Sequence, residues 1–179
     1  MDSMSTSGTS PVVKLQLDVQ SFDAHLWQHY ISSNEESGIG FHTLAELGDT
    51  EANRKRLYEL NKTCSADIPG RGPFYSYEQY RTDRLQTDTY TPAGIILAAE
   101  GETWVGMSAA SHHKEQGYVF NEMTGVLREY RRRGIATALK VLSIQFAASL
   151  GVPVIHTFHA AANVAAIAMN RRLGYTDRL

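Results

Sequence analysis

Cysteine is nearly absent from this sequence: Cys64 is the single one among 179 residues. One cysteine cannot form an internal disulfide bond, so we expect a reducing compartment and a cytoplasmic protein. The sequence has no apolar run of about 18 residues, the length that a membrane-spanning helix needs. It also lacks an excess of charge of one sign, since 17 Lys and Arg against 19 Asp and Glu give a net charge of -2. We therefore expect no nucleic acid and no membrane as a partner.

Residues 1–10 lack both the apolar core and the basic flank of a signal peptide, and they are rich in Ser and Thr. We expect a disordered tail here. The sequence as a whole has the balance of a globular protein, with 42% hydrophobic and 20% charged residues. Its length suits one domain with a real core and is too short for two ordinary domains.

Apolar periodicity and capping residues divide the first half of the chain into strands and helices. Thr50 can cap one helix, and Ser76 with Gln79 resembles a capping box for another. Residues 34–38 are polar and are expected to end the first helix. The predicted order is strand 12–19, helix 22–31, strand 39–44, helix 51–62 and helix 77–85.

From Gly94 the pattern changes to strands, which form an antiparallel meander joined by polar turns. A helix then crosses to a short buried strand, which is expected to run parallel to the strand before the helix. The predicted order is strand 95–99, strand 104–111, strand 118–127, helix 134–150, strand 152–158 and helix 163–173. The fold class is therefore α/β (α+β in some schemes), with a mixed, mostly antiparallel sheet flanked by helices.

Basic residues gather where a strand meets the helix at 134–150. Gly134 and Ala136 leave its first turn with almost no side chains, so the free backbone N–H groups are open to an anion. Five basic residues fall within 13 positions, against one acid, Glu129: Arg128, Arg131, Arg132, Arg133 and Lys140. This local charge suits a pyrophosphate and a further phosphate, although a solvated basic helix start has the same composition.

The residues around this turn resemble the acetyl-CoA-binding motif of the GNAT acetyltransferase superfamily. The resemblance rests on Thr124-Gly125-Val126, Arg131-x-x-Gly134-x-Ala136, Ala138-Leu139-Lys140, Ile155-x-Thr157, Asn163, Asn170 and Leu173-Gly174-Tyr175. It is specific over residues 122–175, and residues 38–70 are similar to one half of bacterial tandem GNAT proteins. It implies a GNAT acetyltransferase domain over residues 39–179, with a splay between the central strands of its sheet, preceded by a strand–helix extension over residues 11–38.

The resemblance implies an N-acetyltransferase that uses acetyl-CoA as the acyl donor and needs no metal. It would move the acyl group to a primary amine of a small molecule by direct attack in a ternary complex. Backbone groups of Val126 and Leu127 would bind the pantetheine arm at a bulge in the strand. Asn163 would help to hold the cofactor, or would simply cap the last helix. The cofactor pyrophosphate would lie on Arg131, Arg132, Arg133, Gly134, Ile135 and Ala136.

Transfer from a thioester to an amine needs a route for the proton of the ammonium group. Glu122, on the strand that leads to the splay, is the first candidate for this base, although it could be an ordinary strand-edge carboxylate. His159 faces the same side as Thr157, so it could touch the cofactor or the acceptor, compete as the base, or be a structural histidine. Asn170 stands where many GNAT proteins carry a tyrosine acid, so the usual acid is missing and Asn170 could instead pack or contact the cofactor.

The resemblance places the acceptor against the first two helices of the domain and their loop. The side chains of this region could line a pocket for a hydrophobic or sugar-like amine, or could only pack the helices: Arg71, Phe74, Tyr75, Tyr77 and Tyr80. The chain ends six residues after Leu173, so the final strand usual in this fold is missing or very short. A second chain could complete the sheet edge, and a homodimer is therefore one expectation.

Two other functions remain open. The missing tyrosine favours a non-catalytic acyl-CoA-binding or partner-binding module, whereas Glu122 and the intact loop favour an enzyme. A protein or peptide N-acetyltransferase would need an open acceptor groove, which a sequence does not show. No Cys or His spacing suggests a metal site, because His112 and His113 are neighbours that face opposite sides of a strand.

Overall fold

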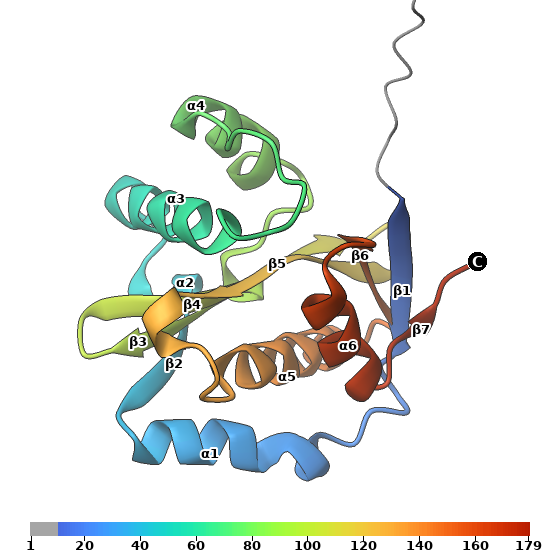
Figure 1. Ribbon diagram of the computed structural model, residues 1–179. Helices are drawn as coiled ribbons and strands as arrows, with labels where there is room; N and C mark the ends of the chain where they lie inside the picture. The colour runs from blue at the N-terminus through green and yellow to red at the C-terminus, as the bar shows by residue number, and fades with distance from the viewer. Residues whose placement is uncertain (1–10) are drawn as a thin grey trace, which may run out of the picture.

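The computed structural model describes residues 11–179, so the disordered tail expected for residues 1–10 lies outside the described part of the chain. The described residues fold around a 7-stranded sheet with the order β2-β3-β4-β5-β6-β1-β7 (Figure 1). The strands are β1 (Val12–Asp18), β2 (Ile39–Thr43), β3 (Ile95–Glu100), β4 (Thr103–His113), β5 (Tyr118–Val126), β6 (Val154–Ala160) and β7 (Thr176–Asp177). β5 and β6 are parallel, and the other neighbouring strands are antiparallel. The α/β fold with a mixed, mostly antiparallel sheet is confirmed.

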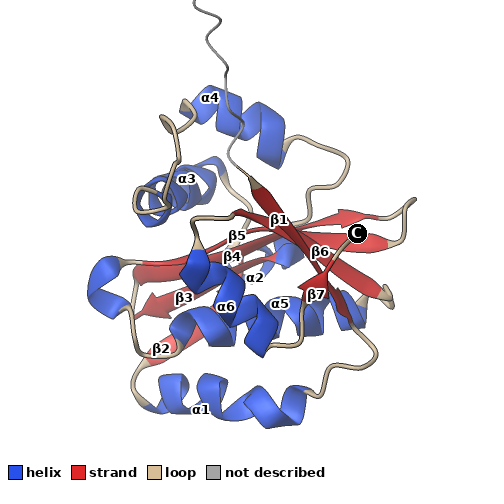
Figure 2. Ribbon diagram, turned by 45° about the vertical axis from the view of Figure 1, so that its right-hand side comes forward, coloured by secondary structure: helices blue, strands red, loops and turns tan. Residues whose placement is uncertain are grey.

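Helices cover both faces of the sheet. The α-helices are α1 (Gln28–Glu36), α2 (Leu44–Leu47), α3 (Glu51–Ser65), α4 (Tyr77–Tyr80), α5 (Ile135–Ser149) and α6 (Val164–Arg172). Figure 2 shows α1 and α5 below the strands and α3 and α4 above them. The shorter helical turns are a π-helical segment at Arg81–Leu85, which continues α4, and 3-10 turns at Ala24–Trp27, Pro92–Gly94 and Arg128–Tyr130.

Side-chain caps fix where several helices begin. Thr50 Oγ1 accepts a hydrogen bond from the Asn53 amide at 3.2 Å at the start of α3. Ser76 and Gln79 form the expected capping box at the start of α4, so both predicted helix starts are confirmed. Another capping box, made by Thr43 with a glutamate, begins α2 directly after β2, where the sequence predicted only the end of a strand.

The first helix differs from its prediction. A 3-10 turn occupies residues 24–27, and α1 runs through Asn34, which we expected to end it. Asn34 is buried, and its Nδ2 donates to the Tyr30 carbonyl at 2.8 Å and to the Arg133 carbonyl at 3.1 Å. The expectation was wrong because the polar amide has partners inside the fold, one of them far along the chain.

Apolar side chains fill the space on each side of the sheet. On the side of α5, Leu15 and Ile155 from the strands pack with Ile144 of the helix. On the side of α3, Leu57 of the helix packs with Leu97 of the sheet. These clusters hold α5 and α3 against the central strands, and the ends of both helices border the site described below.

The end of the sheet next to β6 is built from the two ends of the described chain. β1 pairs with β6 over all of its residues, from Val12 opposite Ala160 to Asp18 opposite Val154. β7 pairs with the middle of β1, so the final strand is present and very short. The segment that we expected to form an extension, residues 11–38, therefore contributes a strand inside the sheet, and the boundary at residue 39 stays a prediction.

Candidate functional site

β5 and β6 separate a third of the way along β5. The two strands pair over Tyr118–Phe120, and from there β5 runs to Val126 beside β4 alone. A bulge lies at the point of separation, because consecutive residues of β4 pair with Asn121 and Met123 and leave Glu122 without a partner. A bulge of this kind bends a strand and redirects its side chains. The splay implied by the resemblance is thus present.

The space between the separated strands is a cleft of about 480 Å³, which we call the main cleft. It is walled by β5, β6, α5, α6 and the loop after α3. Of the predicted site residues, it contains Glu122, Val126, Arg131, Ala136, His159 and Asn163. Asn163 stands at the N-cap position of α6 but makes no capping hydrogen bond with its side chain. Its amide therefore remains available to a ligand in the cleft.

A second hollow of about 350 Å³, which we call the loop hollow, lies at the N-terminus of α5. Two residues of its loop have left-handed backbone, Arg132 with φ 63° and Gly134 with φ 76°. This conformation costs energy at Arg132, which has a Cβ atom, and such strain is common where a loop clamps a ligand. The hollow is lined by Tyr30, Val126, Tyr130, Arg131, Arg132, Gly134, Ile135, Ala136, Thr137 and Arg172. Arginines at a helix N-terminus make it a site for an anion.

The basic cluster around this loop is smaller than the sequence indicated. Asp67, from the loop after α3, lies 2.6 Å from a nitrogen of Arg128 and 2.9 Å from one of Arg131. Hydrogen bonds from these two guanidinium groups hold the pKa of the Asp67 carboxyl below its usual value. Lys140 does not contribute to the surface charge, because it is buried and donates to Asn121 Oδ1 at 2.6 Å.

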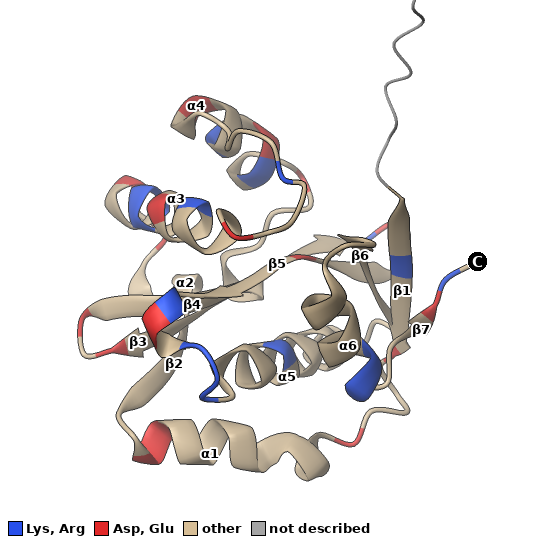
Figure 3. Cartoon of the chain, in the orientation of Figure 1, with Lys and Arg blue, Asp and Glu red and all other residues tan. Residues whose placement is uncertain are grey.

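Arg172 is a member of the site that the sequence did not predict. It lies at the end of α6, lines the loop hollow and donates to Thr137 Oγ1 at 3.3 Å. Figure 3 shows basic positions at the C-terminal end of α6 and in the loop that precedes α5. Arg133 was predicted but does not line the loop hollow, and its exposed guanidinium lies 5.0 Å from the Tyr130 ring centroid. Only the fold brings the end of α6 to this loop, so no local pattern could point to Arg172.

The end of β5 directs its backbone groups in alternate directions. The Leu127 N–H donates to the Val105 carbonyl at 2.8 Å, within the sheet. Alternate residues of an antiparallel strand point their peptide groups to opposite sides, so those of Val126 face the splay. The Val126 carbonyl there accepts from Arg131 Nε at 3.0 Å. Of the two backbone sites that we expected for the pantetheine arm, only Val126 faces the main cleft, because the Leu127 N–H is already bonded.

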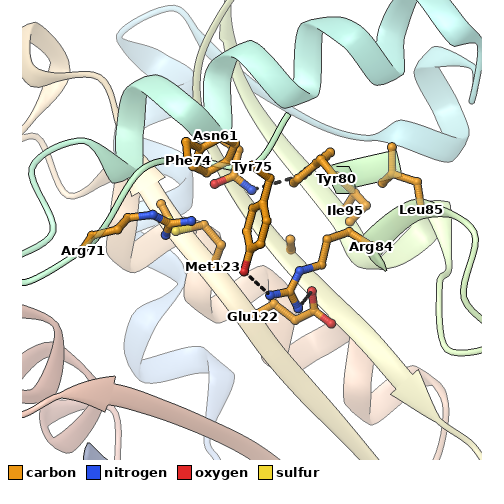
Figure 4. A pocket seen from close by; sticks show the side chains of 11 residues that line it. Asn61, Arg71, Phe74, Tyr75, Tyr80, Arg84, Leu85, Ile95, Glu122 and Met123 are labelled. Atoms are coloured by element: carbon orange, nitrogen blue, oxygen red, sulfur yellow. Dashed lines mark hydrogen bonds and ion pairs between the residues drawn. The ribbon is translucent and has the colours of Figure 1, made fainter. Parts of the chain in front are cut away.

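Glu122, the bulge residue, lies where the main cleft meets a small pocket of about 60 Å³ (Figure 4). The Arg84 guanidinium is 3.2 Å from Glu122 Oε2 and donates to the Tyr75 hydroxyl at 3.4 Å. Burial works against the charge of Arg84, but Glu122 and Tyr75 outweigh it and raise the pKa of the guanidinium. The carboxylate is therefore held in a fixed position at the junction of the two spaces.

The aromatic region after α3 divides between two roles. Its members that line the small pocket are Arg71, Phe74, Tyr75 and Tyr80. Tyr77 instead packs edge-on against Tyr58 of α3, with ring centroids 5.4 Å apart. The pocket and the helix packing that the sequence left as alternatives are both present.

His159 and Asn170 form a pair at the side of the main cleft. The buried Asn170 directs its Nδ2 to His159 Nε2 at 2.8 Å and donates to the Ala166 carbonyl at 2.9 Å. An amide Nδ2 only donates, so His159 Nε2 accepts and the proton of the neutral ring sits on Nδ1. Burial and the charge of Lys140 lower the pKa of His159 to about 4. The imidazole is therefore neutral at pH 7. His159 lines the main cleft, whereas Asn170 lies behind it and contacts the cleft only through this hydrogen bond.

A buried polar network lies directly behind the splay and is centred on Asn121. Its Nδ2 donates to Ser108 Oγ at 3.0 Å, and its Oδ1 accepts from Lys140. Thr157 Oγ1 of β6 donates to the Asn121 carbonyl at 3.0 Å. The network ties β5 to β6 and α5 where the strands separate, and the sequence pointed to neither Asn121 nor Ser108.

Metal ligands do not gather in the described part of the chain. Within residues 11–179, no group of three or more His, Cys, Asp or Glu side chains could hold a metal ion. The helices of the same residues are all too short or too polar to cross a membrane.

Similarity to known structures supports the fold. Over 93% of its length the chain matches a GCN5-related N-acetyltransferase from Sphaerobacter thermophilus, with a TM-score of 0.68, 19% identity and 48% of that chain covered. A tandem GNAT protein from the clavulanic acid biosynthesis pathway matches with a TM-score of 0.64 and 19% identity, over 96% of this chain and 51% of that one. Naa50 of Arabidopsis thaliana, in complex with the bisubstrate analogue CoA-Ac-MVNAL, matches with a TM-score of 0.56 and 22% identity, over 76% of this chain and 82% of that one. The chain thus spans about half the length of the first two relatives.

Comparison of the sequence with family models identifies the family. No curated protein matches it significantly. The family model described as the acetyltransferase (GNAT) family matches residues 54–175, which is well over half of the sequence and includes most of α3, all of β3 to β6, and α5 and α6. The chain belongs to the acetyltransferase (GNAT) family.

Proposed function

We propose that the chain is an N-acetyltransferase that uses acetyl-CoA and transfers the acyl group to a primary amine of a small molecule. The proposal rests on one observation, the continuous row formed by the small pocket, the main cleft and the loop hollow. The residues shared by the small pocket and the main cleft are Arg71, Glu122 and Met123. Those shared by the main cleft and the loop hollow are Val126, Arg131 and Ala136.

This row fits the parts of the two substrates in order. The loop hollow, with its arginines and helix N-terminus, would take the pyrophosphate of acetyl-CoA. The pantetheine arm would follow β5, with Val126 as backbone partner and Asn163 on the opposite wall. The thioester would then lie at the splay, beside Glu122, and the acceptor amine would approach from the small pocket.

The chemistry in this arrangement is a direct attack. The amine nitrogen forms a bond to the thioester carbonyl carbon, the carbon–sulfur bond breaks, and the sulfur leaves as the CoA thiolate. Glu122 would accept the proton of the attacking ammonium, directly or through water, while Arg84 keeps the carboxylate in place. The Val126 N–H, which faces the splay, would polarise the carbonyl oxygen.

No tyrosine acid is needed for the leaving group in this scheme. The Asn170 amide is not an acid near neutral pH, and His159 is neutral at pH 7 with its Nε2 engaged by Asn170. A CoA thiolate is a tolerable leaving group, so a water molecule in the cleft can supply its proton. His159 and Asn170 would then position the cofactor rather than transfer protons.

The size of the small pocket favours a small acceptor over a peptide. A space of about 60 Å³ beside Glu122 has room for the head of a small amine, whereas a peptide would have to extend beyond it. The peptide alternative has its own support, since Naa50 binds an analogue that joins CoA to a peptide. Thiol release from acetyl-CoA, measured against a panel of small amines and N-terminal peptides, separates the two. A protein that binds CoA but releases no thiol with any acceptor in the panel would instead be a binding module.

Glu122→Gln tests the proposed base. The change keeps the shape but removes the proton acceptor, so we expect turnover to fall by roughly 10²–10⁴ and the acidic limb of the pH profile to disappear. The KM for acetyl-CoA should change little. Glu78→Gln on exposed α4 is the matched control and should behave as the parent protein. A comparable loss in His159→Ala, with Glu122→Gln active, would reverse the two roles.

A further inference from the structure

The small pocket carries more positive than negative charge. Its lining includes the guanidinium groups of Arg71 and Arg84 and one carboxylate, that of Glu122. Figure 4 shows Tyr75 projecting between the two arginines, with its hydroxyl toward Arg84. A pocket with an unbalanced charge beside the candidate base is suited to an occupant that brings an anion of its own.

Arg84 already has an anionic partner, whereas Arg71 has none within residues 11–179. Arg84 is bonded to Glu122 at 3.2 Å. Arg71 forms no ion pair with any residue of the described chain, 11–179, and its guanidinium lies 4.7 Å from the Phe74 ring centroid. Burial and the neighbouring charge of Arg84 lower the pKa of Arg71. A cation beside a like charge is stabilised when an anion binds next to it.

The anionic groups of acetyl-CoA lie at the other end of the row in the proposed arrangement. Among the described residues, the small pocket and the loop hollow share no lining residue, and the main cleft separates them. The loop hollow has its own arginines, Arg132 and Arg172, for the phosphates. Arg71 is therefore left for the acceptor.

We propose that the acceptor is an amino acid or a close analogue: a primary amine with a carboxylate on a nearby carbon. This deepens the proposed function and rests on it. The ammonium group would face Glu122, and the carboxylate would face Arg71, whose planar guanidinium matches a carboxylate with two parallel hydrogen bonds. Phe74 and Tyr75 would contact the carbon skeleton between them. The hydrophobic or sugar-like amine considered from the sequence lacks the anion that this arrangement needs.

Matched acceptors test the proposal. Thiol release from acetyl-CoA is measured with the common amino acids and with their carboxamides, which keep the amine and the side chain but lack the carboxylate. We expect kcat/KM to favour the carboxylate by roughly 10–100-fold, the effect typical of a hydrogen bond to a charged group. In Arg71→Gln this preference should fall toward unity. In Arg81→Gln, an arginine of the π-helical turn that does not line the pocket, it should persist.

Equal use of acids and carboxamides by the parent protein, or an equal loss for both in Arg71→Gln, would overturn the proposal. A second measurement separates it from the proposed function. Calorimetric titration of amino acids and carboxamides into the CoA-loaded protein reports the carboxylate preference without turnover. If amino acids bind in a way that needs Arg71 but no thiol is released, the proposed enzymatic activity is wrong and the proposed ligand class is retained. If thiol is released without any preference for the carboxylate, the enzymatic activity is retained and the amino-acid acceptor is wrong.

Discussion

The ammonium group of Lys140 lies beneath the splay, where Asn121 Oδ1 accepts its hydrogen bond at 2.6 Å and the Tyr175 ring centroid is 5.1 Å away. Within residues 11–179, no other charged side chain is buried to this degree. Burial lowers the pKa of Lys140 to about 7. The folded protein therefore loses this proton near neutral pH, whereas an unfolded lysine keeps it until about pH 10.4.

Lys140 should make the protein more stable as the pH rises from about 7 to 10. In this range the unfolded chain binds a proton that the folded protein does not, so the free energy of unfolding increases with pH. Replacing the lysine in Lys140→Met should remove this contribution. Between pH 6.5 and 9 the parent should gain on the order of 2 kcal/mol relative to the variant, measured by urea unfolding.

Comparing the two proteins at each pH isolates Lys140, because every group other than its neighbours titrates alike in both. Lys114→Met, at an exposed turn, is the control and should follow the parent at every pH. A constant difference between the parent and Lys140→Met across the range would show that the buried amine does not titrate there.

Single residues were predicted well where local sequence determines their surroundings, and poorly where it does not. Gly134 and Ala136 could be recognised because the turn and the helix start are contiguous in sequence. Lys140 was counted with the surface arginines because its spacing on α5 does not reveal the buried Asn121 beside it. Asp67 and Arg172 were missed because separate loops and helices bring them to the site.

At the scale of elements, α5 is flanked by two glycines with the same backbone conformation. Gly134 precedes the helix with φ 76°, and Gly151 follows it with φ 70°. Their surroundings differ, because a Cβ atom on Gly134 would lie 2.7 Å from Tyr30 Cδ1 of α1, whereas nothing lies within 4 Å of one on Gly151. Gly134 thus serves both the loop hollow and the contact of α1 with α5.

Alanine at each end of α5 should separate these two effects. Gly151→Ala should cost about 1–2 kcal/mol of unfolding free energy, the cost of left-handed backbone alone. Gly134→Ala should cost more, by a further ~1–3 kcal/mol for the contact with Tyr30. Chemical denaturation measures both. Equal losses in the two variants would mean that α1 moves aside without cost.

The elements themselves could largely be predicted. Periodicity and caps gave α3, α4, α5 and the β3–β4 hairpin, because these signals are local. The first helix was misplaced because Asn34 is satisfied by the Arg133 carbonyl, on a distant loop. The position of β1 in the sheet could not be read from the sequence either, since register depends on its partner strands.

At the scale of the whole molecule, β1 is the main support of β6. β6 pairs with β5 over Tyr118–Phe120 only, because of the splay, but with β1 over its full length. Leu15 of β1 is fully buried opposite Thr157, the residue that donates to the Asn121 carbonyl where β5 and β6 separate. One wall of the main cleft is therefore held in place from its far side, by the first strand of the described chain.

Loss of packing in β1 should therefore loosen β6 as well. Leu15→Ala removes a fully buried side chain and should lower the free energy of unfolding by about 2–5 kcal/mol. Val12→Ala, at a side chain that is 52% exposed on the same strand, should change it by less than about 0.5 kcal/mol. Hydrogen exchange distinguishes a shared unit from a separate strand, since amides that open together are accelerated together. We expect the protected amides of β1 and β6 to exchange faster by the same factor in Leu15→Ala. Faster exchange confined to β1, with β6 unchanged, would mean that the stability of β6 does not depend on β1.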